Sequence, residues 1–233
     1  MTLRAVVKGV GHYLPERIVP NAEFEKTLDT TDEWIKSRSG IERRHFAAEG
    51  ETTSMLATKA AQAALTNAGM TADDVDAIVL ATSTADLTFP SAATMVQANL
   101  GMTKGFAFDI QAVCAGFVFA LSNANALILS GQAKRVLVIG AETFSRIMDW
   151  TDRGTCVLFG DGAGALILEA EEGAGDNGDR GILSTDLNSD GTHRDLLYVD
   201  GGVSTGTSGY LRMQGNQVFR HAVGKLAATA TTA

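Results

Sequence analysis

Three short, almost uniformly apolar runs, separated by segments of helical character, most constrain what this chain can fold into. The runs are Asp76–Thr82, Phe106–Phe108 and Arg135–Gly140. Apolar runs of this length are typical of strands that are buried on both faces of a sheet. Because helices are expected between them, the alternation predicts an α/β protein whose sheet is parallel or largely parallel.

The helices expected around these runs have recognisable boundaries. Thr53–Ala68 is rich in alanine and is followed by Gly69, a residue suited to a helix C-terminus. Pro90 is expected to open a helix that continues to Leu100. A short helix is predicted from Asn21 to Leu28, with Asn21 as its cap.

Cys114 lies where the strand at Phe106–Phe108 leads into a helix that is apolar on nearly every face. This helix is predicted to be the most buried one in the chain. A thiol at a helix N-terminus feels the positive end of the backbone dipole, which favours the thiolate. A reactive nucleophile and an inert core cysteine are both consistent with this feature alone.

Bulk properties narrow the class of protein. The chain has 233 residues, enough for a substantial core, and its net charge of −8 argues against a generic nucleic-acid-binding surface. No apolar run reaches membrane-spanning length, and the N-terminus has no apolar region typical of a signal peptide, so we expect a soluble cytoplasmic protein with no membrane partner. Its two cysteines predict neither a disulfide framework nor a metal site.

The glycine-rich motif Gly160–Ala165 resembles a dinucleotide-binding loop only at first sight. That loop needs a following helix, whereas Ala165–Ala170 is typical of a strand. We therefore expect two strands to approach closely here. The acidic, glycine-rich stretch Glu171–Asp179 is expected to separate two halves, and Ile182–Asn188 is expected to be a strand.

Short motifs distributed along the whole chain together resemble β-ketoacyl-acyl-carrier-protein synthase III, a family of initiating condensing enzymes in the thiolase-like superfamily. Their order and spacing, more than any one of them, carry the resemblance. The motifs are Thr31–Ile35 with Arg38 and Gly40-Ile41, Phe89–Ala92, Cys114–Phe117, Thr151–Thr155, Phe159–Ala165, and Gly215-Asn216 with Phe219.

The resemblance implies a layered αβαβα fold built from two related βαβαβαββ halves. Residues 1–172 would form the complete first half and residues 173–233 part of the second. It also implies a homodimer and a reaction of acetyl-CoA, or another short acyl-CoA, with malonyl-acyl carrier protein. The products would be 3-oxoacyl-carrier protein, CO₂ and CoA, formed through an acyl-cysteine; acyl-CoA is then a substrate, and no cofactor is implied.

The resemblance also assigns roles to individual residues, each of which has an ordinary structural alternative as a core, capping or surface residue. In the basic cluster that begins at Arg38, for example, the alternatives are a solvated face and a site for an anion and a ring. The implied nucleophile is Cys114. The residues implied to bind CoA are Trp34 and Arg153 around the adenine, Arg38 near the phosphates, and Gly215, Asn216 and Phe219 along the pantetheine. Phe89 and Phe144 are implied to line the acyl pocket, and Arg220 is implied to contact the carrier protein.

Two motifs of the family are not found within these 233 residues: a His-Gln-Ala-Asn segment and an Asn in a Gly-Asn-Thr-Ser segment. Their side chains would stabilise the enolate formed by decarboxylation. We therefore expect no condensation by this chain alone. Two alternatives stay open: a truncated fragment that only binds CoA or dimerises, and a specialised starter-unit synthase of a polyketide or quinolone pathway.

Overall fold

The computed structural model of the protein describes residues 2–233, which form two compact units. The first unit consists of the chain up to Pro15, together with Glu49–Glu142 and Gly162–Thr185. The second consists of the stretches Glu16–Ala48, Thr143–Asp161 and Asp186–Ala233. The boundary predicted at residue 172 separates two related halves of a longer fold. The division into two compact units does not test that boundary, so it stays a prediction.

Strands and helices alternate along the first unit. Its strands are β1 (Thr2–Tyr13), β4 (Ala77–Ala81), β5 (Phe106–Ile110), β6 (Arg135–Thr143) and β7 (Asp161–Gly173). Its helices are α3 (Thr53–Ala68), α4 (Ala92–Asn99) and α5 (Gly116–Leu129), and 3₁₀ turns lie at Ala72–Asp74 and Val113–Ala115.

The five strands form one sheet in the order β1-β7-β6-β4-β5. β4 pairs in parallel with both β5 and β6, so the parallel arrangement predicted for the three apolar runs is confirmed. β1 pairs antiparallel with β7 and places Gly11 opposite Ala165 and His12 opposite Gly164. Ala165–Ala170 lies in a strand, as predicted, and this strand already begins at Asp161 within the glycine-rich motif, so no helix directly follows the motif to form a dinucleotide-binding loop.

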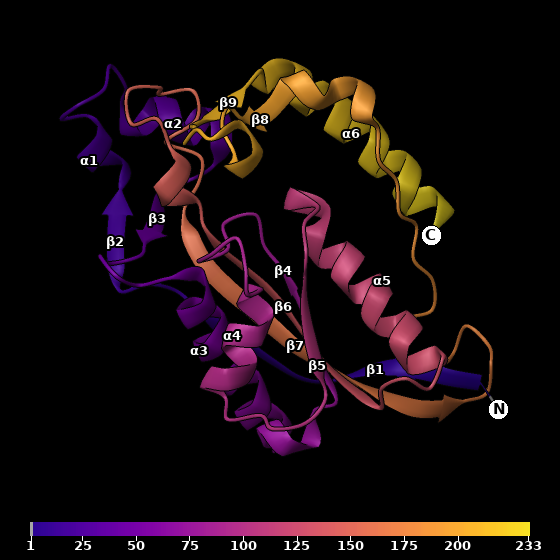
Figure 1. Ribbon diagram of the computed structural model, residues 1–233. Helices are drawn as coiled ribbons and strands as arrows, with labels where there is room; N and C mark the ends of the chain where they lie inside the picture. Colours follow the sequence, from indigo (N-terminus) through magenta and orange to yellow (C-terminus); the bar gives the residue numbers. More distant parts are fainter. Residues whose placement is uncertain (1) are drawn as a thin grey trace. The chain divides into compact units, whose positions relative to one another are not determined.

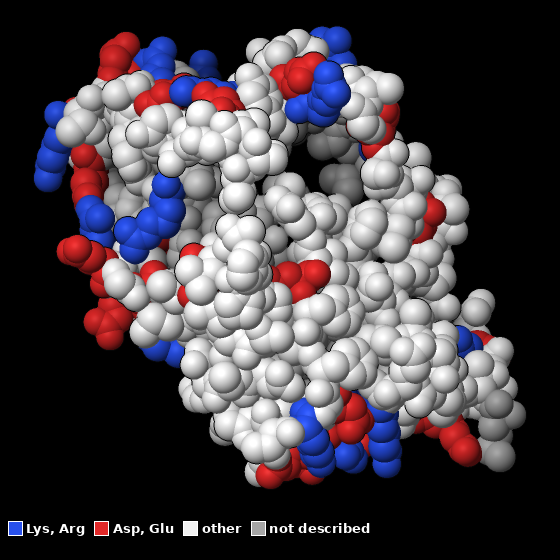
Figure 2. Space-filling view, in the orientation of Figure 1, with Lys and Arg blue, Asp and Glu red and all other residues white. Residues whose placement is uncertain are grey.

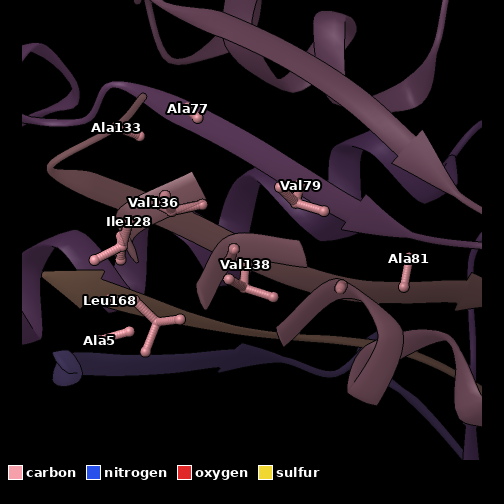
Figure 3. Packing of buried hydrophobic residues seen from close by; sticks show 11 residues of the cluster. Ala5, Ala77, Val79, Ala81, Ile128, Ala133, Val136, Val138 and Leu168 are labelled. Atoms are coloured by element: carbon pink, nitrogen blue, oxygen red, sulfur yellow. The ribbon is translucent and has the colours of Figure 1, made fainter. Parts of the chain in front are cut away.

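Helices cover both faces of this sheet (Figure 1), with α3 and α4 on one face and α5 on the other. The element order β1-α3-β4-α4-β5-α5-β6-β7 is the βαβαβαββ order expected for a first thiolase-like half. Figure 3 shows the apolar cluster between the sheet and α5. Its buried members are Ala5, Ala77, Val79, Ala81, Ala120, Ala124, Ile128, Ala133, Val136, Val138 and Leu168.

Small residues allow α3 to lie directly against β1. A Cβ atom at Gly11 would stand 2.2 Å from the backbone nitrogen of Ala64, and one at Gly9 would stand 2.6 Å from the oxygen of the same residue. Both positions on the strand therefore require glycine, and alanines on the helix complete the close approach. The helix ends as predicted: Gly69 adopts a left-handed conformation with φ +66°.

The second unit is built from short elements. Its strands are β2 (Arg17–Pro20), β3 (Arg43–Phe46), β8 (Leu197–Val199) and β9 (Leu211–Met213). Its helices are α1 (Asn21–Phe24), α2 (Asp32–Ser39) and α6 (Gly215–Thr232), and 3₁₀ turns lie at Phe144–Ile147, Gly191–Leu196 and Val203–Thr205. Buried residues from most of these elements form one core, which consists of Val19, Phe24, Ile35, Phe46, Phe144, Met148, Cys156, Val157 and Leu211.

The structure corrects the role predicted for Asn21. The helix expected to run to Leu28 ends at Phe24, and Asn21 does not cap it. Its buried side chain instead donates to the Asp32 carboxylate (2.8 Å) and accepts from the Arg44 guanidinium (2.8 Å). A buried arginine needs such acceptors more than an exposed helix end needs a cap, and this arginine is only 6% exposed.

Three further predictions about elements are wrong: the start of α4, the strand at residues 182–188 and the burial of α5. α4 begins at Ala92 and is capped by Ser91, so Pro90 precedes the helix and takes part in a cis peptide bond with Phe89. Residues 182–188 form no strand; one backbone hydrogen bond, from Ile182 to Ala5 (3.0 Å), ties the segment to β1.

α5 is also less buried than predicted. Only the stripe Gly116, Ala120, Ala124 and Ile128 is buried, because the sheet contacts one side of the helix. The other apolar residues of the helix are partly buried or exposed, and Val118 is 47% exposed.

Acidic and basic side chains are interspersed on the face shown in Figure 2, and no continuous basic patch appears there. None of the helices within residues 2–233 is long and apolar enough to cross a membrane.

Candidate active site

Cys114 lies in a strained turn between β5 and α5. The turn, Val113–Ala115, is a 3₁₀ turn, and Val113 has a φ of +48°. A positive φ is an outlier for a β-branched residue and marks a conformation that the surrounding structure imposes. The thiol of Cys114 is exposed. A strand, a strained turn and a helix in succession thus present this thiol at the end of the sheet.

Cys114 lies between a strand and a helix, as predicted, and the structure refines its position relative to α5. The α-helix begins at Gly116, so the thiol precedes it instead of lying in its first turn. The N–H groups of Ala115 and Gly116 donate to the carbonyl oxygens of Ala112 and Val113 and close the 3₁₀ turn. These two N–H groups are therefore engaged in shaping the turn.

The ends of the neighbouring strands support this turn. A Cβ atom at Gly116 would lie 3.2 Å from the Cβ of Ala81, the last residue of β4. One at Gly140 of β6 would lie 3.2 Å from the ring of Phe117. Cys114 therefore lies at the carboxyl ends of parallel strands, where α/β sheets commonly place their binding and catalytic groups.

Glu142 is a residue of this region that sequence reasoning did not find. Its carboxylate accepts from the backbone N–H of Ser83 (2.8 Å), from the hydroxyl of Thr84, and from the hydroxyl of Thr82 (3.4 Å). Burial raises the pKa of Glu142 above its usual value, against the effect of these three donors. The only sequence signal was a carboxylate directly after an apolar strand.

Asp109 is a second residue that the sequence did not reveal. It lies in β5, and its carboxylate accepts from the N–H groups of Ala92 and Ala93 at 2.7 Å each. These are orphan donors at the first turn of α4, so the carboxylate satisfies them and complements the helix dipole. The adjoining Phe89, predicted to line the acyl pocket, is 82% exposed.

In the second unit, the three residues predicted to bind the nucleotide of CoA lie together. The guanidinium carbon of Arg38 is 4.5 Å from the ring centroid of Trp34, and that of Arg153 is 5.1 Å from it. Both are cation–π distances. Arg153 also donates to the backbone oxygen of Asp29 and pairs with its carboxylate at 3.1 Å.

Trp34 itself is held in α2. The hydroxyl of Thr31 accepts from the backbone N–H of Trp34 (3.0 Å) and caps the helix. The next residue, Ile35, is buried in the core of the unit. The tryptophan is therefore presented from a fixed helix.

The loop that carries Arg153 is braced by an ion pair that the sequence did not suggest. Hydrogen bonds from Thr151, together with the ion pair to Arg212 (2.7 Å), lower the pKa of Asp149 to about 2. Arg212, in β9, also pairs with Asp200 at 2.7 Å. Because these partners are far apart in sequence, only the fold brings them together.

The remaining predicted residues lie on α6 or in the core of the second unit. Gly215, Asn216, Phe219 and Arg220 occupy the first turns of α6 and are exposed, Phe219 at 71%. Phe144 is only 8% exposed and its ring lies 5.2 Å from that of Phe159. The predicted site residues thus fall into two sets, with Cys114 and Phe89 in the first unit and the others in the second.

The glycine-rich motif contains a structural carboxylate. Asp161 is 5% exposed and accepts from the N–H groups of Ala47 (2.7 Å) and Ser145 (2.8 Å) and from the hydroxyl of Ser145 (2.6 Å). Its role is to join two segments of the second unit. An aspartate flanked by glycines in an otherwise apolar stretch was the available signal.

The second cysteine is in a different environment from the first. Cys156 is fully buried, and burial raises its pKa to about 11, so it is a neutral thiol near pH 7. Among residues 2–233, no three histidine, cysteine or acidic side chains are arranged to hold a metal ion.

The chain is similar to known proteins in sequence and in structure. The family model of 3-oxoacyl-[acyl-carrier-protein] synthase III matches residues 108–191. The β-ketoacyl-[acyl-carrier-protein] synthase III of Roseobacter denitrificans is 84% identical over all 233 residues, which cover 72% of that protein, and the enzyme of Ruegeria pomeroyi has the same identity and coverage. The crystal structure of 3-oxoacyl-(acyl carrier protein) synthase III from Pseudomonas aeruginosa superimposes with a TM-score of 0.89 at 42% identity, over 98% of this chain and 69% of that one.

Proposed function

Because the chain belongs to the β-ketoacyl-[acyl-carrier-protein] synthase III family, we propose that it is the acyltransferase that initiates type II fatty acid synthesis. The observation that carries the proposal is identity of 84% to a named synthase over the whole of this chain. The polyketide priming synthase that it resembles is only 33% identical, so a specialised starter-unit pathway is not favoured.

The covalent step assigned to Cys114 is a thioester exchange. Its thiolate attacks the carbonyl carbon of a short acyl-CoA, a new carbon–sulfur bond forms, and the bond to the CoA sulfur breaks. The thiol proton leaves to solvent or to the departing CoA thiolate. The exposure of Cys114 and the backbone conformation at Val113 support this role. The exposure leaves the thiol accessible to a substrate, and the imposed backbone conformation fixes its position.

Recognition of the CoA nucleotide is assigned to the second unit. Trp34 and the two guanidinium groups beside it offer a ring face and positive charge, which suit an adenine and its phosphates. Gly215, Asn216 and Phe219 are proposed to contact the pantetheine, and their exposure on α6 leaves them available to a ligand. The reaction takes acyl-CoA as substrate and needs no cofactor.

In the family's reaction, the acyl-cysteine is then proposed to react with malonyl-acyl carrier protein. This step is proposed for an enzyme that also has the His and Asn donors described above, which are not found within these 233 residues. Loss of CO₂ gives an enolate that attacks the acyl group and releases the Cys114 thiolate. Arg220 is proposed to meet the acidic carrier, and its exposure supports this. We further propose a cytoplasmic homodimer: both cysteines are free, β5 is an edge strand, and the exposed Phe89 offers apolar surface to a second copy. Phe89 and Phe144 are proposed to line the acyl pocket.

Intact-mass analysis after incubation with acetyl-CoA tests the covalent step. We expect a gain of one acetyl group, lost in Cys114→Ser and retained in the control Cys156→Ser. Folded wild-type protein that gains no acetyl group, or an adduct that survives in Cys114→Ser, would contradict the assignment.

A further inference from the structure

A half-buried glutamate lies beside the Cys114 turn and has no part in the reaction described above. Glu142 follows the apolar core of β6, and its side-chain partners are all in the segment Thr82–Thr84, which follows β4. The carboxylate therefore ties together the ends of two adjacent strands of the sheet.

Both of these strand ends touch the chain that carries the nucleophile. The N–H of Thr82 donates to the oxygen of Ile110, the last residue of β5 (3.1 Å). The preceding Ala81 lies close to Gly116: a Cβ atom at Gly116 would stand 3.2 Å from the Cβ of Ala81, a tight contact. From β6, Gly140 lies against the ring of Phe117 in the same way. The two strand ends thus support the crossover immediately before and immediately after Cys114.

From this geometry we propose that Glu142 is a positioning residue for Cys114, acting through Thr82–Thr84. Its carboxylate fixes the separation of the ends of β4 and β6, and these ends form the support on which Ile110–Phe117 rests. The inference rests on the proposed acyl transfer for its kinetic consequence, since the group acts on the orientation of the thiol and touches no reacting atom.

The chemistry of the contact favours a structural carboxylate at this place. Ser83 N–H and two threonine hydroxyls supply three donors, and a carboxylate has enough acceptor sites for all of them. Removing the acceptor leaves donors unsatisfied in a half-buried position, so the 82–84 segment is expected to move to find other partners. An amide at the same place keeps one acceptor oxygen, and a threonine hydroxyl can turn to accept from its nitrogen.

The test compares Glu142→Ala and Glu142→Gln with wild type. We expect the acetylation rate constant of Cys114 at saturating acetyl-CoA to fall by about 10- to 100-fold in the alanine variant, because small misplacements of a nucleophile cost this much. The glutamine variant should lie between alanine and wild type. The concentration of acetyl-CoA at half-saturation should stay within about two-fold, since the nucleotide-binding residues belong to the other unit.

A matched control comes from the same sheet. Glu169 in β7 pairs with Arg135 at 2.6 Å, at the opposite end of β6 from Glu142. Glu169→Gln replaces another hydrogen-bonded carboxylate of this sheet without touching Thr82–Thr84, so it should acetylate at the wild-type rate. Should Glu142→Ala fail to fold, Thr84→Val removes one donor and leaves the carboxylate, and a smaller loss in the same direction is expected.

Hydrogen–deuterium exchange makes the result independent of the acyl transfer. Peptides covering residues 82–84 and 111–117 should exchange faster in Glu142→Ala than in wild type. In Glu169→Gln the same peptides should exchange at the wild-type rate. If wild type is acetylated and both Glu142 variants are acetylated at the wild-type rate, the positioning role is overturned. Absence of acetylation in wild type would instead overturn the proposed function, and unaltered exchange at 111–117 would then reject the positioning role on its own.

Discussion

Cys114 and Cys156 illustrate how strongly the surroundings of a residue decide its chemistry. Both are single thiols next to apolar residues in the sequence. In the structure, Cys114 is exposed in a strained turn, whereas Cys156 has no exposed surface and a pKa raised to about 11 by burial. Only the first thiol combines accessibility with a position that the backbone fixes.

This difference predicts selective alkylation. Iodoacetamide near pH 8 should modify Cys114 and leave Cys156 unmodified in the folded protein, because the buried thiol is both inaccessible and neutral at that pH. Peptide mass mapping after limited reaction measures the two yields separately. In denaturant both cysteines should react, which serves as the control; preferential modification of Cys156 under native conditions would refute the placement of the two side chains.

Residues within the motifs that carry the family resemblance were found from the sequence, and residues that act through distant partners were not. Trp34, Arg38 and Arg153 were predicted as one group, and the structure brings their side chains together. Glu142 has no such signature, because its partner Thr84 is 58 positions away in the sequence. A carboxylate at the end of a strand is common, and only the neighbouring strand gives this one its hydrogen bonds.

At the level of elements, the contact between α3 and β1 depends on the absence of side chains. Gly11 faces the backbone of α3 so closely that any Cβ atom would overlap it. Gly164, on the neighbouring strand β7, has open space at the same place on its backbone. Both positions are glycines in strands, so replacement by alanine changes the intrinsic strand propensity equally. A difference in stability between the two alanine variants therefore measures packing alone.

Gly11→Ala should therefore destabilise the protein by about 3 kcal/mol, since the overlap is with backbone atoms that cannot turn away. Gly164→Ala should change the free energy of unfolding by less than about 1 kcal/mol. Urea titrations followed by circular dichroism would measure both variants. Equal stability of the two would contradict the close packing of α3 on β1.

Across the molecule, as described from residue 2 to residue 233, carboxylates whose pKa values are lowered outnumber the one whose pKa is raised. Hydrogen bonds and nearby cations lower the pKa of seven acidic groups, listed as Asp32, Asp74, Asp149, Glu171, Asp179, Asp190 and Asp200. Burial raises the pKa of Glu142 and acts in the opposite sense. Because the lowered pKa values outnumber the raised one, we expect acid to destabilise the fold.

The sign follows from linkage. A carboxyl group with a lowered pKa in the folded state stabilises it above the unfolded pKa of about 3.8, and this contribution is lost as the pH falls through the folded value, about 2 for Asp149. The urea midpoint should therefore fall between about pH 4 and pH 2. Asp149→Asn should show a shallower fall over the same range, and an unchanged slope in that variant would show that Asp149 is not among the groups responsible.

Local patterns in the sequence determined most of the first unit. Apolar runs predicted β4, β5 and β6, the alternation with helices predicted their parallel pairing, and Gly69 marked the end of α3. These features depend on residues within one or two turns of each other, where periodicity and backbone preference act directly. The position of Cys114 between a strand and a helix followed from the same patterns.

The tertiary structure alone decided which polar groups became part of the framework. Arg44 belongs to a basic stretch that suggests a solvated surface, yet it is buried and donates to the oxygen of Val157, 113 positions away (2.7 Å). Asn21 partners this arginine instead of capping a helix. Asp161 and Glu142 likewise bind groups from distant segments. Such contacts follow from how segments pack, because a buried polar group must find its partners among whatever the fold places beside it.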